Sequence, residues 1–176
     1  MNILIFTDNK KYNMHCEEYK IIWELEGKKI QKSFEKILKL SFNESTINLL
    51  INEGKNNSNY SGDNTKDNMH FRYNNRSKLG TFLHELSHRI VMEYSLLEIA
   101  QKKYNIVEIH QLIDLFLYDV IEDLYGKDAA DLRVKYESNF EEKIYSNSWN
   151  YALSFTFEKR QEMLKNIVGD IKNEKK

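Results

Sequence analysis

The sequence predicts an α+β fold that is mainly helical, with a small antiparallel or mixed sheet next to one helix. Three observations predict this class. Segments rich in β-forming residues fall in the first half of the chain, and stretches with apolar residues at helical spacing fill most of the remainder. The length of 176 residues suits one domain with a buried core, and no internal repeat divides it. We therefore expect a single domain over residues 1–176.

A strand and a helix open the chain. Residues 1–8 predict a short strand, and residues 13–40 predict a helix with one apolar face, either continuous or broken near Gly27. Residues 45–52 are rich in β-forming side chains and predict a second strand. Residues 53–66 are rich in Gly, Asn, Ser and Asp without periodicity, so they predict a loop.

A third strand is predicted over residues 68–74. Met69, Phe71 and Tyr73 alternate there with polar residues, as in a strand buried on one face. Such a strand is either an ordinary member of the sheet or an open edge to which an extended peptide adds as a further strand. The sequence leaves both interpretations open.

The next helix begins after Ser77, a residue type that often caps helix N-termini. Its apolar stripe is formed by Leu79, Phe82, Leu83, Leu86 and Ile90. At 100° per residue, His84 and His88 fall on roughly the opposite side from that stripe. The placement disfavours two ordinary core histidines.

Helices are also predicted for the rest of the chain. Residues 107–125 have an apolar stripe, and Gly126 lies where a helix C-terminal glycine is common. The chain from Ala129 onward is helical by its pattern, and residues 172–176 form a polar tail that we expect to fray. The side chains expected to pack this region on the body are Trp149, Tyr151, Ala152, Leu153 and Phe155.

Composition excludes several classes of protein. The 26 basic and 27 acidic residues nearly cancel, so we expect no broad attraction to nucleic acid. Cys16 is the single cysteine, which excludes an internal disulfide and fits a reducing compartment. No apolar run has the length of a membrane span, and the first residues lack the features of a signal peptide. We therefore expect a cytoplasmic protein without membrane or nucleic-acid partners, and the oligomeric state stays open.

The most informative motif is His84-Glu85-Leu86-Ser87-His88, an HExxH pattern. Positions i and i+4 of a helix lie on one face, so the imidazoles of His84 and His88 can bind one zinc ion from the same side. Glu85 lies beside the metal, where its carboxylate can take a proton from a water. The pattern predicts zinc-dependent peptide hydrolysis.

A catalytic zinc needs a third protein ligand, and the chain does not continue the motif as HExxHxxGxxH. The helix over residues 107–125 offers His110, Asp114, Asp119, Glu122 and Asp123. Asp119 lies at the border of the apolar face, where a carboxylate is costly to bury without a partner, so Asp119 is the predicted ligand. Glu122 and Asp114 are the alternatives, although Asp114 is expected to face solvent. Asp123 is a candidate to hydrogen-bond a ligand histidine.

On these residues the chain resembles the zincin metallopeptidases. Among them it looks like the small, minimal gluzincin or aspzincin kind, whose third ligand is a carboxylate from a downstream helix. The resemblance covers roughly residues 45–126 in layout, and HExxH is its one specific motif. The Asn-Glu-x-x-Ser-Asp helix motif of larger gluzincins is absent.

The resemblance implies a mechanism and a substrate class. His84, His88 and Asp119 would bind zinc, which lowers the pKa of a water toward neutrality. Glu85 would accept the proton of that water as it attacks the scissile carbonyl, and would then deliver it to the leaving amine. The substrate would be a peptide or protein. The candidates for an oxyanion donor, among which spacing does not choose, are His70, Tyr118 and Tyr125.

Two other interpretations compete with the peptidase. HExxH proteins of similar size also act as regulators that bind or cut one partner, such as a repressor of a mobile element. A structural zinc is the third interpretation. Glu85 argues against it, since structural zinc sites are closed by four protein ligands and need no general base.

Overall fold

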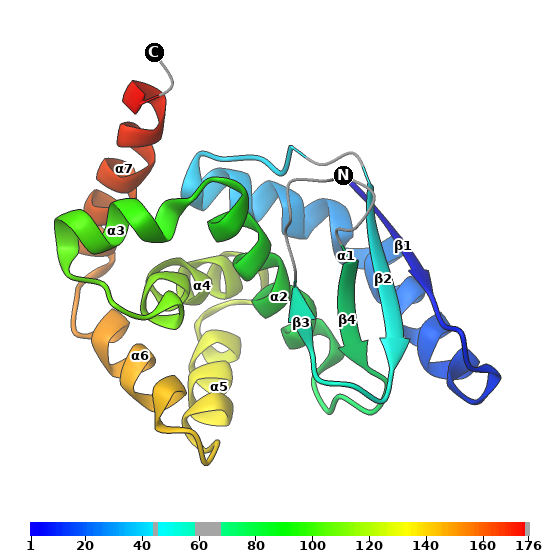
Figure 1. Ribbon diagram of the computed structural model, residues 1–176. Coiled ribbons are helices and arrows are strands. Elements are labelled where there is room, and N and C mark those ends of the chain that lie inside the picture. Colours follow the sequence, from blue (N-terminus) through cyan, green and yellow to red (C-terminus); the bar gives the residue numbers. More distant parts are fainter. Residues whose placement is uncertain (44–45, 59–67, 175–176) are drawn as a thin grey trace. The chain divides into compact units, whose positions relative to one another are not determined.

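A computed structural model describes residues 1–43, 46–58 and 68–174 (Figure 1). Over these ranges it contains seven α-helices, one short 3-10 helix and a four-stranded sheet, which confirms the α+β class. The chain forms two compact units. The first unit comprises residues 1–31 and 41–93, and the second comprises residues 32–40 and 94–176. The single domain expected from the sequence stays a prediction.

The sheet belongs to the first unit. Its strands are β1 (Asn2–Phe6), β2 (Thr46–Asn52), β3 (Asn57–Ser58) and β4 (Asn68–Arg72), arranged in the order β1-β2-β4-β3 (Figure 1). β1 pairs with β2 and β2 with β4 in parallel, whereas β3 pairs with β4 antiparallel. The sheet is therefore mixed, and the three strands predicted from the sequence are confirmed.

β3 was not predicted, because it lies in the segment whose composition indicates a loop. It pairs Asn57 with His70 and Ser58 with Met69. One residue earlier, the Asn56 side-chain oxygen accepts a hydrogen bond of 2.7 Å from the Arg72 N–H. β4 thus has neighbours on both sides. The open edge considered for β4 is occupied by β3, and β4 is an ordinary member of the sheet.

Helix α1 (Asn13–Leu38) follows a 3-10 turn (Lys10–Tyr12) and runs without interruption through Gly27. Of the two alternatives, the continuous helix is confirmed. A Cβ atom at Gly27 would lie 2.8 Å from Cδ2 of the Trp23 ring, so the glycine gives space to the indole rather than a bend to the helix. The residues of α1 from Lys32 onward belong to the second unit.

Aromatic rings join α1 and α2 (Lys78–Glu93) to one face of the sheet. The Phe71 ring on β4 lies 5.0 Å from Phe82 on α2 and 5.3 Å from Tyr19 on α1, measured between ring centroids. Residues that alternate along the strands are fully buried beneath these helices: Ile47, Leu49, Ile51, Met69 and Phe71. The helix that carries the HExxH motif is next to the sheet, as predicted.

The second unit contains the last turns of α1 and five further helices. These are α3 (Leu96–Tyr104), α4 (Ile109–Tyr125), α5 (Lys127–Ser138), α6 (Lys143–Leu153) and α7 (Phe157–Glu174). α4 packs against α3, α5, α6 and α7. It starts with a capping box between Glu108 and Gln111, and it ends at Gly126, whose φ of 84° disfavours any residue with a side chain. The predicted end of this helix is confirmed.

The end of the chain departs from expectation at Leu153. Trp149 and Ala152 are buried as predicted, but Leu153 is 40% exposed because α6 ends there. Residues 172–174 continue α7 as helix and residues 175–176 lie outside the described part, so the frayed tail stays a prediction. Among the helices described, none combines the length and apolar character needed to cross a membrane.

Candidate metal centre

The two histidines of the HExxH motif lie on α2, in the first unit, on the side of the helix away from its apolar stripe. Phe82, Leu86 and Ile90 are fully buried. His84 is 8% exposed and His88 is half-buried, one helical turn further on. The sequence prediction that both imidazoles share one face of this helix is confirmed.

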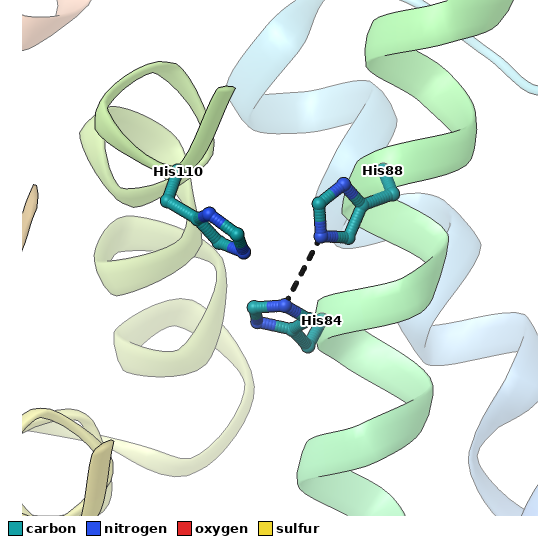
Figure 2. Close-up of side chains that lie close together, drawn as sticks. All are labelled: His84, His88 and His110. Atoms are coloured by element: carbon teal, nitrogen blue, oxygen red, sulfur yellow. Dashed lines mark hydrogen bonds between the residues drawn. The ribbon is translucent and has the colours of Figure 1, made fainter. Parts of the chain in front are cut away.

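The two imidazoles point at each other through the same ring atom. Nε2 of His84 and Nε2 of His88 lie 3.1 Å apart, and the ring centroids are 4.9 Å apart (Figure 2). Without a metal this contact is a hydrogen bond in which one imidazole donates and the other accepts. Two nitrogen ligands of a tetrahedral zinc, each at about 2.0–2.1 Å, would be separated by about 3.3 Å. The pair therefore has the donor type and the spacing of two zinc ligands.

A third imidazole is available on α4 of the second unit, where His110 was among the candidates predicted from the sequence. Three histidines are a ligand set used by catalytic zinc sites, with one position left for water. Within the first unit, His84 and His88 fit two of the three protein ligands of such a site.

Glu85 is buried on α2, with 6% of its surface exposed. As the neighbour of His84 in sequence, it projects about 100° away around the helix, so it does not duplicate the direction of the ligand. A carboxylate beside a metal, rather than on it, is suited to accepting and returning a proton.

Asp119 is buried in the second unit, but its contacts are with α7. Its carboxylate pairs with the Arg160 guanidinium and accepts a hydrogen bond of 3.1 Å from Gln161 Nε2. The sequence argument that this carboxylate needs a partner was sound. The partner that the structure provides is a guanidinium, and the role of Asp119 as a zinc ligand stays a prediction.

The expectation that Asp114 faces solvent is wrong. Its side chain is 1% exposed, and the Ser148 hydroxyl on α6 donates a hydrogen bond of 2.6 Å to it. The reason is that α5 and α6 cover the side of α4 that a one-sided stripe would leave in water. Burial raises the pKa of Asp114 well above its usual range.

The other acidic candidates on α4 lie nearer the surface. Asp123 pairs with Lys36 on α1, and this hydrogen bond lowers the pKa of the Asp123 carboxyl. The role of Asp123 as a hydrogen-bond partner of a ligand histidine stays a prediction. Glu122 is half-buried.

The candidate oxyanion donors can also be placed. The Tyr118 hydroxyl donates a hydrogen bond of 2.7 Å to Asp131 on α5. His70 lies with its Nδ1 atom 3.3 Å from Asn52 Nδ2 on the neighbouring strand. Tyr125 is half-buried at the end of α4. The contacts of Tyr118 and His70 are structural within their own units.

The sequence pattern did not single out His110, although it was among the candidates on its helix. The angle to the apolar stripe favoured a carboxylate, Asp119. The residue type is the signal in favour of His110, because imidazole is the commonest metal ligand.

Comparisons of the chain with protein-family models, with curated proteins and with solved structures found no match. The resemblance to the zincins therefore depends on the HExxH residues and on the layout of elements around them.

Proposed function

We propose that this chain is a zinc-dependent peptidase in which His84 and His88 bind the metal and Glu85 is the general base. The observation that carries the proposal is the 3.1 Å separation of the two Nε2 atoms, which suits two ligands of one ion. The buried carboxylate of Glu85, next to one of these histidines, is what a hydrolytic zinc site needs in addition.

His110 is proposed as the third ligand. Its side chain is an imidazole, the commonest metal ligand, and three histidines are a ligand set of catalytic zinc sites. The carboxylates of Asp114 and Asp119 are hydrogen-bonded to side chains of α6 and α7, which would have to be displaced before either could bind a metal. Asp119, the ligand predicted from the sequence, is the alternative.

The chemistry follows from the ligand set and the base. Zinc bound here would act as a Lewis acid and would lower the pKa of a water. The Glu85 carboxylate accepts a proton from the attacking water as the new C–O bond forms at the scissile carbonyl. The same carboxyl group then donates this proton to the amide nitrogen as the C–N bond breaks. The substrate class is a peptide or protein.

Zinc content tests the metal site. We expect close to one zinc per chain after incubation with the metal, and loss of zinc in His84→Ala. His15→Ala is the matched control, because His15 lies on α1 and hydrogen-bonds Glu18 instead. Absence of zinc from the parent protein, or equal zinc content in His84→Ala and His15→Ala, would refute the proposed metal site.

The third ligand is tested by measuring zinc affinity in competition with a chelator. Loss of a group that merely supports a ligand weakens metal binding by about 10–100-fold, so we expect His110→Ala, which removes a ligand, to weaken it at least that much. Asp119→Asn should leave the affinity unchanged. The reverse result would assign the site to Asp119.

Glu85→Gln separates hydrolysis from partner binding. A peptidase should keep its zinc and lose turnover of an unfolded protein substrate, since the amide cannot accept the proton. Glu98→Gln, an exposed residue on α3, is the control for the loss of one carboxylate. Undiminished turnover in Glu85→Gln would refute the role of this base, and a parent protein that binds zinc but cleaves nothing would favour a binding protein.

A further inference from the structure

Two side-chain contacts, one turn apart on each helix, join α6 to α4. His110 and Asp114 are separated by one turn on α4, and Tyr145 and Ser148 are separated by one turn on α6. The His110 and Tyr145 rings are in edge-to-face contact, with centroids 5.0 Å apart and an interplanar angle of 62°. The Ser148 hydroxyl donates a hydrogen bond of 2.6 Å to Asp114. Two contacts one turn apart fix both the register and the rotation of α6 against α4.

The Tyr145 ring also contacts a row of aromatic rings contributed by residues that precede it in the chain. Its ring contacts Phe140 at a centroid distance of 5.3 Å, and Phe140 contacts Tyr136 at 5.1 Å. The guanidinium of Arg133 lies 5.8 Å from the Tyr136 centroid. Edge-to-face pairs of this kind are each favourable by about 0.5–1.5 kcal/mol beyond burial, so these contacts favour the observed orientation of the Tyr145 ring.

The row ends in a buried ion pair. Arg133 pairs with Glu137, one turn along α5, and Glu137 also accepts a hydrogen bond of 2.8 Å from the Trp149 indole N–H on α6. Glu137 and Trp149 are both almost fully buried. The Trp149–Glu137 hydrogen bond therefore joins α6, which carries Tyr145, to α5.

We infer that Tyr145 is a positioning residue that orients the imidazole of His110 for metal binding. An imidazole rotates about two side-chain torsions, and the second is broad unless a neighbour restricts it. An aromatic edge packed on the ring selects one orientation before the metal arrives, so less freedom is lost on binding. Groups that orient a ligand histidine commonly change metal affinity by about 10–100-fold. This inference rests on the proposed function, in which His110 is the third ligand.

The test compares three variants for zinc affinity in competition with a chelator. Tyr145→Ala removes the ring and should weaken zinc binding about tenfold or more. Tyr145→Phe keeps the ring and should bind zinc like the parent protein. Tyr151→Ala is the control on the same helix, because Tyr151 pairs with Phe155 and has no ring contact with His110 among the described pairs. If Tyr145→Ala does not fold, Tyr145→Leu supplies apolar volume without the aromatic ring.

A second readout needs no metal. In nuclear magnetic resonance spectra of the metal-free protein, the His110 ring protons should carry a ring-current shift that is lost in Tyr145→Ala and kept in Tyr145→Phe. Unchanged His110 signals, or equal zinc affinity in the Ala and Phe variants, would overturn the inference. A parent protein that binds no zinc but shows the ring-current shift would refute the proposed function alone, and would leave Tyr145 as the residue that orients His110.

Discussion

α2 and α4 each combine apolar residues at helical spacing with ionisable side chains, yet only α2 could be interpreted side chain by side chain. In α2, His84 and His88 are partners within the same helix. In α4, the buried carboxylates of Asp114 and Asp119 have their partners on α6 and α7, 34 and 41 residues later. A helical pattern fixes the relation between its own side chains. The partner of a buried ionisable side chain depends on which other helix packs against it.

The largest expected effect comes from breaking the pair that joins α4 to α7. Asp119→Ala leaves the Arg160 guanidinium buried without its carboxylate, and both side chains are almost fully buried in the parent protein. Removal of one member of such a pair costs about 3–5 kcal/mol. We expect the free energy of unfolding in urea to fall by that amount.

A double substitution sharpens this prediction. Asp119→Leu with Arg160→Met replaces the pair by apolar side chains and should recover most of the lost stability, since buried pairs are often no better than apolar packing. If Asp119→Ala instead folds with unchanged stability and loses its zinc, the carboxylate is a ligand, and the contrast between α2 and α4 disappears.

The part of the candidate site that lies on a single helix, α2, could be predicted from the sequence. The i, i+4 spacing placed His84 and His88 on one face, and Glu85 followed from the motif. The sequence could not choose the third ligand, because all its candidates lie on a helix that begins about 20 residues later and the spacing between helices does not fix their packing. Burial of Asp114 was missed for the same reason, since α4 is covered on more than one side.

The fold was predicted better where side chains alternate than where the chain turns. β4 alternates in burial as its sequence does, and β2, which was predicted from its β-forming residues, alternates in burial too. β3 has two residues, too few for alternation to be detected, and it forms because β4 offers it a partner. A break at Gly27 was one of two alternatives; glycine has low helix propensity, but α1 continues through it and Trp23 packs over it.

Alanine substitutions at two glycines in long helices, one in each unit, should change the free energy of unfolding by smaller amounts and in opposite directions. Gly27→Ala in α1 would bring a Cβ to 2.8 Å from Trp23, whose ring stacks on Phe82, so overpacking of about 1–3 kcal/mol should exceed the gain in helix propensity of about 1 kcal/mol. At Gly169 in α7, nothing lies within 4 Å of the new Cβ, so Gly169→Ala should stabilise by up to about 1 kcal/mol. Thermal or urea unfolding should show opposite signs. Stabilisation by both would show that the Trp23 ring moves aside freely.

The smallest change in the free energy of unfolding is expected for Asp114→Asn at acidic pH. The difference in stability between this variant and the parent protein should grow as the pH rises. Burial raises the pKa of Asp114, so the folded chain keeps a proton that the unfolded chain loses above the usual carboxyl pKa. The stability of the parent protein therefore falls as the pH rises toward the folded-state pKa. The amide in the Asp114→Asn variant does not titrate, so it adds no such dependence.

Asp131→Asn provides the opposite sign. Its hydrogen bond from Lys127 lowers the pKa of the Asp131 carboxyl, so the stability that this carboxylate contributes is present above its usual pKa and is lost as the pH falls. Urea unfolding of both variants and the parent protein over a pH series measures the two trends. If the difference between Asp114→Asn and the parent does not change with pH, Asp114 is not held protonated by burial. The covering of α4 by α6 would then be looser than the 2.6 Å contact with Ser148 indicates, and the orientation of His110 one turn away would lose its support.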